Sequence, residues 1–248
     1  MADPLLNVAG DIIEPGVLKE VSPGVYWLRM PLPFALNHIN LWALEDGDGW
    51  TLVDTGINRD EIRAVWEDLF KGPLAGRPVK RIIVTHFHPD HMGLAGWLTE
   101  KFDVEMWATE KEWNTASGLY RDTGPDHVER ALVFYRAAGF NDELMEEVKN
   151  RQNPYPRRVS FIPESYRKIA DGDVIDIGGR DWRIVVGTGH SPEHACLYCA
   201  DPHVLISGDQ ILPKITPNVS VFPQFPVQNP LENFLGSLDN FRGLDPDT

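Results

Sequence analysis

Cysteine is scarce in this chain, which has only Cys196 and Cys199 among its 248 residues. Two cysteines cannot form the disulfide network of a small secreted protein, and they tolerate a reducing compartment. Both lie in an apolar strand candidate, "HACLYCA", where a strand turns residues three apart to opposite faces. We therefore interpret them as buried core thiols rather than as a metal or redox motif.

Basic residues are also few. The chain carries 23 Lys and Arg against 37 Asp and Glu, which gives a formal charge of -14. This charge repels phosphate backbones and anionic membrane surfaces, so we expect neither a nucleic-acid partner nor a membrane partner. The same charge, without a basic stripe, argues against a nuclease.

Long apolar runs are missing as well. No segment approaches the roughly 20 apolar residues that span a bilayer, and the first residues, "MADPLLNVAGDIIEPG", lack the pattern of a secretory signal. We therefore expect a cytoplasmic protein that acts on a small molecule, with homo-oligomerisation left open. No GxSxG nucleophile motif and no phosphate-binding glycine loop occurs, which removes two large classes of enzyme.

The length and the 42% hydrophobic content predict a single α/β domain over residues 1–248. The first third alternates strand signals with turn residues and predicts antiparallel sheet, followed by a helix. Residues from about 107 to 160 are polar, acidic and aromatic, and predict a helical insert. Strands then return, and a final helix is expected over 230–244. Two strand-rich halves, each followed by helix, predict sheet packed on sheet with helices outside.

The expected strands span 25–31, 38–45, 50–56, 79–85, 173–179, 181–189, 194–200 and 203–209, and the expected helices 58–72, 92–102, 126–140 and 141–152.

The stretch "THFHPDHMG" at residues 85–93 places three histidines and an aspartate where a strand ends and a helix begins. Side chains two apart in an extended segment share a face, so His86 and His88 can bind one ion. A chain that enters a helix turns its next side chains, so Asp90 and His91 can bind a second ion nearby. Imidazole and carboxylate suit zinc, iron and manganese alike.

Other strand ends supply partners for this cluster. His190 follows a strand through the turn in "VVGTGHSPEH", and Asp209 ends a strand in "VLISGDQ". A carboxylate can bridge two cations, so Asp209 between them is chemically sensible. Asp54, in "TLVDTG", is expected to hold a ligand in orientation rather than to bind metal itself.

The order "VDTG", "THFHPDH", "GTGHSPEH" and "SGD" resembles the metallo-β-lactamase superfamily, in particular its glyoxalase II-like hydrolases. The resemblance covers nearly the whole chain and implies an αββα sandwich with the metals at one edge. It implies that His86, His88 and His190 bind the first metal, that Asp90 and His91 bind the second, and that Asp209 bridges them. His194 matches a position of the family that does not bind metal, and we expect it behind the ligands. The expected cofactor is one or two Zn²⁺ ions, with iron or manganese as alternatives.

One departure from the family pattern concerns the second metal. Members usually carry a last histidine after the bridging aspartate, whereas no histidine follows His203 in this chain. We expect the natural protein to continue beyond Thr248, so that the domain is truncated at its C-terminal end; the alternative is a native protein with a weakened second site.

The predicted function is metal-dependent hydrolysis, in which a metal-bound hydroxide attacks a small ester, thioester, lactone or amide. Asp90 would orient the hydroxide or accept its proton. The alternatives are a mononuclear iron oxygenase of the same fold and a non-catalytic binding or sensor protein.

Weaker expectations concern the surroundings of the site. Lys214, Asn218 or Ser220 could contact substrate from the proline-rich loop that follows Asp209. The insert carries Trp113, Tyr120, Phe134 and Tyr135, which would either cap the pocket or pack two helices together. His38 and His127 are expected to be structural or surface residues.

Overall fold

The structure, a computed structural model, describes residues 12–34, 36–245 and 248. Its strands form a seven-stranded sheet in the order β1-β2-β3-β4-β5-β6-β7 and a four-stranded sheet in the order β11-β10-β9-β8. The strands are β1 (Leu18–Ser22), β2 (Val25–Pro31), β3 (His38–Asp46), β4 (Gly49–Val53), β5 (Val79–Ile83), β6 (Met106–Thr109), β7 (Arg167–Ile169), β8 (Val174–Ile177), β9 (Arg180–Gly187), β10 (His194–Cys199) and β11 (Val204–Ile206). The helices are α1 (Asp60–Lys71), α2 (Pro89–Met92), α3 (Ala95–Phe102), α4 (Glu110–Arg121), α5 (Pro125–Ala137), α6 (Asp142–Asn150), α7 (Tyr155–Arg158), α8 (Pro230–Ser237) and the 3-10 turn η1 (Leu238–Phe241).

The larger sheet changes direction at β4. Strands β1 to β4 pair antiparallel, as the first third of the sequence predicts. Strands β4 to β7 pair parallel, because helices connect them. The carboxyl ends of β4 and β5 therefore meet at one edge, with Val53 opposite Ile83.

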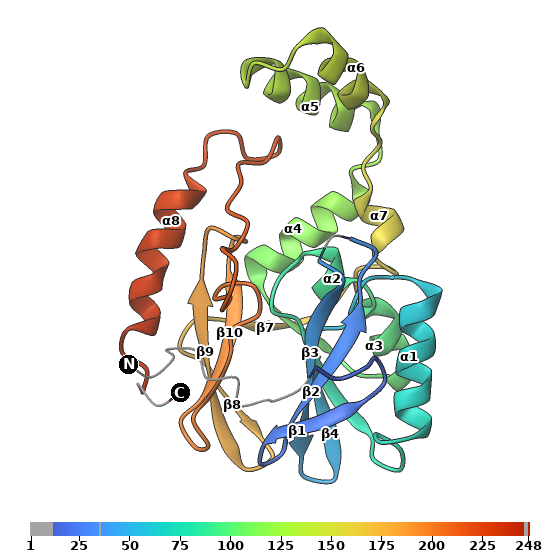
Figure 1. The fold of residues 1–248 in the computed structure, drawn as a ribbon, viewed down its shortest axis with the longest axis vertical. Helices are drawn as coiled ribbons and strands as arrows, with labels where there is room; N and C mark the ends of the chain where they lie inside the picture. Colours follow the sequence, from blue (N-terminus) through green and yellow to red (C-terminus); the bar gives the residue numbers. More distant parts are fainter. Residues whose placement is uncertain (1–11, 35, 246–247) are drawn as a thin grey trace.

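The two sheets pack face to face with helices on the outside (Figure 1). Between the sheets, Val53 and Ile83 meet Trp182 and Leu197 from the smaller sheet. On the outer face of the larger sheet, the buried Trp66 of α1 contributes to a second core. On the outer face of the smaller sheet, η1 covers β9. This is the αββα sandwich that the sequence predicts.

Strand direction in the smaller sheet brings two more strand ends to the site. Strands β9 and β11 both pair antiparallel with β10, so they run in the same direction and end at the same edge. A backbone hydrogen bond from Ala195 to the carbonyl of Thr85, 2.9 Å long, links the sheets there. The segments that follow β4, β5, β9 and β11 therefore share one edge of the sandwich.

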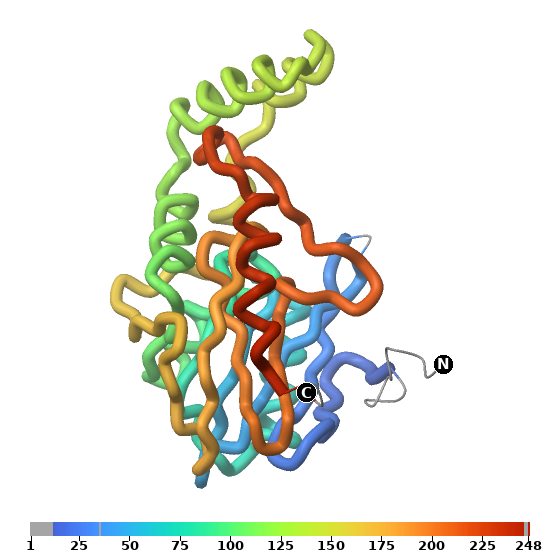
Figure 2. The backbone as a smooth tube through the Cα atoms, turned by 90° about the vertical axis from the view of Figure 1, so that its left-hand side faces the viewer, coloured from blue at the N-terminus to red at the C-terminus, as the bar shows by residue number. Residues whose placement is uncertain are grey.

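The polar segment that was expected to be a helical insert from residue 107 begins as sheet. Residues 106–109 form β6, which pairs with β5 and β7, because Met106 and Ala108 are buried in the core. The part that leaves the body is the hairpin of α5 and α6, which projects beyond the sandwich (Figure 1). Figure 2 shows the segment between β11 and α8 reaching toward this hairpin before the chain turns back.

Both cysteines are free and buried, as predicted. Cys199 lies in the core between the sheets and Cys196 on the opposite face of β10, so their side chains do not converge. In the described part of the chain, no helix is long and apolar enough to cross a membrane.

Candidate metal centre

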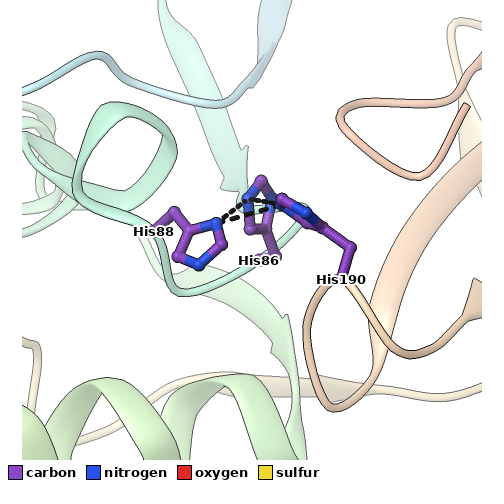
Figure 3. A group of neighbouring side chains, drawn as sticks. All are labelled: His86, His88 and His190. Atoms are coloured by element: carbon purple, nitrogen blue, oxygen red, sulfur yellow. Dashed lines mark hydrogen bonds between the residues drawn. The ribbon is translucent and has the colours of Figure 1, made fainter. Parts of the chain in front are cut away.

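Three histidines direct ring nitrogens at one another beyond the ends of β5 and β9. Nε2 of His86 lies 2.9 Å from Nδ1 of His88 and 3.2 Å from Nε2 of His190. Nδ1 of His88 lies 3.0 Å from Nε2 of His190. Figure 3 shows the three rings meeting from two separate loops. The structure thus brings together the three residues that the sequence assigns to one metal.

Hydrogen bonds at Nδ1 of His190 and His86 determine which nitrogen of each ring carries the proton, and so whether Nε2 points a lone pair into the cluster. His190 donates from Nδ1 to the carbonyl oxygen of Asn218, 2.9 Å away, because a carbonyl can only accept. His86 has its Nδ1 3.0 Å from the Thr85 hydroxyl, whose hydrogen is directed to the Asp54 carboxylate. Both Nε2 atoms of the neutral rings then carry lone pairs, and a cation between them would relieve their repulsion.

Burial keeps these rings neutral. It holds the pKa of His86 and His88 well below the usual histidine value, and the neighbouring rings add to the effect. Burial also lowers the pKa of His190. Neutral imidazole is the form that binds metal, so the cluster needs to release no proton before it does so.

The spacing of the three nitrogens fits a metal ion. Zinc binds imidazole nitrogen at about 2.0–2.1 Å, and tetrahedral geometry then separates two such nitrogens by about 3.3 Å. The separations among His86, His88 and His190 are 2.9, 3.0 and 3.2 Å. Nitrogen ligands alone do not distinguish zinc from iron or manganese.

A second set of ligand atoms adjoins the first. His86, His91 and Asp209 each offer one ligand atom, and these atoms lie within 4.8 Å of one another. Asp209 faces both sets, with Oδ1 3.4 Å from Nε2 of His91 and Oδ2 3.6 Å from Nε2 of His190. Asp90 lies at the margin, with Oδ2 4.0 Å from Nε2 of His91. This is the arrangement that a bridging carboxylate requires.

Charge at this second set also suits a cation. Nε2 of His91 is buried and has no hydrogen-bond partner in the described part of the chain. Burial lowers the pKa of His91, but the Asp54 and Asp209 carboxylates outweigh burial and raise it well above its usual value. Burial likewise opposes ionisation of Asp209, yet His91 lowers the pKa of Asp209 overall. A positive charge is therefore favoured between His91 and Asp209.

Asp54 holds this arrangement from behind. Its Oδ2 accepts a hydrogen bond from Nδ1 of His91 at 2.7 Å, and its Oδ1 accepts one from the backbone of Thr85 at 2.8 Å. The residue has a φ of 63°, a left-handed backbone that costs energy for a non-glycine side chain. Asp54 therefore contacts His91 directly, and its supporting role remains a prediction.

His194 supports Asp209 in a similar way. Its Nε2 accepts a hydrogen bond of 3.1 Å from the backbone N–H of Asp209, and the ring is fully buried. Gly208 leaves room for the ring, since a Cβ there would lie 2.6 Å from its Cε1 atom. His194 therefore contacts the backbone of Asp209, and its supporting role remains a prediction.

The loop after β11 brings only some of its polar side chains to the histidine cluster or the adjoining cavity. Asn218 meets the site through its backbone carbonyl, and its side chain accepts a hydrogen bond from Ser220 at 2.5 Å. Ser220 lines the adjoining cavity, whereas Lys214 is not among the residues that do. Substrate contacts by Lys214 and Asn218 remain predictions.

Glu112 is a residue that sequence reasoning missed. This buried carboxylate on α4 accepts hydrogen bonds from the backbone of Phe87 at 2.9 Å, the backbone of Glu193 at 2.6 Å and the hydroxyl of Ser191 at 2.7 Å. Burial raises its pKa to about 7. Glu112 thus ties the loop of His86 and His88 to the loop of His190. Nothing in the sequence distinguishes Glu112 from the exposed acidic residues near it in the chain.

A cavity of about 700 Å³ adjoins the three histidines, two of which, His88 and His190, form part of its wall. Much of the rest of the wall comes from α4, the α5–α6 hairpin, α7, the loop after β9, and α8 with the loop before it. Tyr135 of the hairpin and His127, which was expected to be structural, both line it. Trp113 instead stacks on Tyr166, with ring centres 4.7 Å apart.

Comparisons with known proteins agree with this geometry. The chain is 34% identical over 196 residues to the probable metallo-hydrolase YybB of Bacillus subtilis (strain 168), covering 77% of this chain and 71% of that protein. It is 25% identical over 209 residues to an acyl-coenzyme A thioesterase of Homo sapiens, covering 78% of this chain and 65% of that protein.

A solved structure shows the same fold at closer identity. The crystal structure of a beta-lactamase domain protein from Burkholderia ambifaria is 43% identical, with a TM-score of 0.83 over 98% of this chain and 72% of that one. Residues 36–248 match the family described as the metallo-beta-lactamase superfamily. The chain belongs to the metallo-beta-lactamase superfamily.

Proposed function

We propose that this protein is a metal-dependent hydrolase of small carbonyl substrates: an ester, thioester, lactone or amide. The observation that carries the proposal is the meeting of His86, His88 and His190 nitrogens beside the pair of His91 and Asp209. This ligand set lies at the wall of a cavity large enough for a small molecule.

Metal ions held by these residues would lower the pKa of bound water and polarise a substrate carbonyl. In the proposed assignment His86, His88 and His190 hold the first ion. Asp90 and His91 hold the second, with Asp209 between the two. Zinc is the proposed metal.

Asp90 is the proposed proton acceptor. Its side chain is 22% exposed, so it can reach both the site and solvent, unlike the buried Asp54. Nearby, Tyr155 donates a hydrogen bond of 2.6 Å to the carbonyl of Phe87, which holds the histidine loop against α7. In this proposal Asp90 is both a ligand of the second ion and the carboxylate that takes the proton.

The names of related proteins support hydrolysis. One relative is called a probable metallo-hydrolase and another an acyl-coenzyme A thioesterase. A thioester is therefore the substrate to test first within the proposed range.

The test combines metal analysis with a substrate panel. The purified protein is loaded with zinc, its metal content is measured, and chromogenic esters, thioesters, lactones and lactams are offered. We expect bound zinc and hydrolysis of at least one class, and in His190→Ala a lower zinc content and no hydrolysis. A matched control is His203→Asn, because His203 lies on the turn at the opposite end of β10 and its left-handed backbone suits asparagine.

Metal binding without hydrolysis of any class would overturn the proposal. Iron together with dioxygen consumption would replace it with an oxygenase.

A further inference from the structure

The cavity beside the histidines differs in charge from the rest of the protein. The chain has 37 acidic against 23 basic residues. Among the described residues that line the cavity, the charged ones are Lys111, Arg151 and Arg158, and none is Asp or Glu. Because the charged side chains of this wall are all positive, the wall would attract a negatively charged ligand even though the protein as a whole is acidic.

Two of these cations have no acidic partner among the residues that the structure describes. Lys111 forms an ion pair with Glu193 at 2.8 Å. For Arg151 and Arg158, no carboxylate of the described residues lies within ion-pair distance. Arg158 instead has its guanidinium 5.3 Å from the ring centre of Phe34, a contact that leaves its charge in place.

The position of Arg158 is coupled to the metal site. It ends α7, whose first residue, Tyr155, bonds to the carbonyl of Phe87 between His86 and His88. Its own backbone carbonyl accepts a hydrogen bond of 3.0 Å from Asn58. Arg158 also lines a neighbouring hollow with Arg157, again without an acidic residue in the described lining. The backbone of Arg158 therefore has a fixed place relative to the histidines, and its exposed side chain carries the positive charge at the cavity wall.

Other parts of the wall are apolar. Leu119, Tyr135 and Val148 come from the helices, and Phe222 and Phe225 from the loop before α8. A ligand that fills this space would place apolar groups against these residues and an anionic group at the arginines.

We propose that the substrate is an amphipathic anion: an ester or thioester whose scissile carbonyl lies at the histidines and whose phosphate or carboxylate binds Arg158 and Arg151. This inference rests on the proposed hydrolase function and specifies its substrate class. Arginine suits both anions, since its planar guanidinium makes paired hydrogen bonds to either.

Two matched substrate pairs test the proposal on the zinc-loaded protein. Butyryl-pantetheine and butyryl-4′-phosphopantetheine differ only by a phosphate. 4-Nitrophenyl butyrate and mono-4-nitrophenyl glutarate differ mainly by a carboxylate. We expect kcat/KM to be higher for the anionic member of at least one pair, and the preference to weaken as salt is added. The pair that shows it distinguishes phosphate from carboxylate.

The variants are Arg158→Ala, Arg151→Ala and Arg158→Lys. Loss of a charge-assisted contact should lower kcat/KM for the anionic substrate by about tenfold while neutral substrates change little, and Arg158→Lys should retain part of the preference. Arg136→Ala is the control, because Arg136 lies on α5 outside the cavity wall and pairs with Asp142.

Equal kcat/KM for charged and neutral substrates, unchanged in Arg158→Ala and Arg151→Ala, would overturn this inference and leave the hydrolase function standing. Failure to hydrolyse any of the four substrates would count against both, and binding of free 4′-phosphopantetheine would then separate them. If the inference is right, this compound should bind the wild type more tightly than pantetheine does, and Arg158→Ala should remove the difference.

Discussion

Asp209 turns one carboxylate oxygen toward His91, with Oδ1 3.4 Å from Nε2 of that ring, and its other oxygen toward His190 at 3.6 Å. Asp209→Asn should reduce the number of metal ions per chain, because an amide offers one acceptor oxygen and no negative charge. Elemental analysis after dialysis checks this. The same metal content in wild type and variant would contradict the bridging position.

His86→Ala and His190→Ala should each empty the first metal site. Either change removes one of the three histidine nitrogens that meet there, and the two remaining histidines with the bridging Asp209 should hold zinc poorly. Titration with a zinc indicator checks the affinity, with His203→Asn as the matched control. Normal zinc affinity in both alanine variants would refute the assignment.

Asp54→Asn should weaken metal binding without removing a ligand. The carboxylate accepts from Nδ1 of His91, and loss of such a supporting partner typically costs about 10–100-fold in metal affinity. Asparagine tolerates the left-handed backbone at this position, so the variant should fold. Zinc competition against a chelator measures the effect. Asp48→Asn, a change at an exposed side chain, should leave the affinity unaltered.

Glu112 should make stability depend on pH. Its pKa rises from an ordinary 4.5 to about 7, so the folded chain holds this proton more tightly than the unfolded chain does. The stability that it contributes is complete below about pH 4.5 and is lost as the pH rises to about 7. Relative to Glu112→Gln, the free energy of unfolding of wild type should fall by about 3 kcal/mol across this window.

Urea unfolding of both proteins with a chelator present, at several pH values, measures that difference. Glu110→Gln is the control on the same helix, because Glu110 is exposed and its hydrogen bond with Lys168 lowers its pKa. A constant difference between wild type and Glu112→Gln from pH 5 to 8 would show that Glu112 does not titrate there.

The sequence predicted most of the sandwich because its strands have strong local patterns. The stretches at 25–31, 38–45 and 194–200 became β2, β3 and β10 almost without change of boundary. The predicted family and fold are confirmed by the match over residues 36–248. The glyoxalase II-like branch and the second metal remain predictions.

Three strands, β1, β6 and β7, escaped prediction. Strands β6 and β7, of four and three residues, are too short to show a period, and only pairing with their neighbours makes them sheet. The insert was consequently placed to begin too early. Whether its aromatics would cap the pocket or pack helices together was equally open, and the fold places Tyr135 in the cavity wall and Trp113 against Tyr166.

The sequence by itself determined which types of side chain are candidate ligands and which of them are neighbours. His86, His88, Asp90 and His91 lie in one short segment, so local geometry alone brings them together. Only the tertiary structure decided what surrounds them. Glu112 and Arg158 are single charged residues in polar segments, and nothing local distinguishes them from solvent-exposed charges. Their places follow from long-range packing, which buries Glu112 between two ligand loops and sets Arg158 at the wall of the cavity.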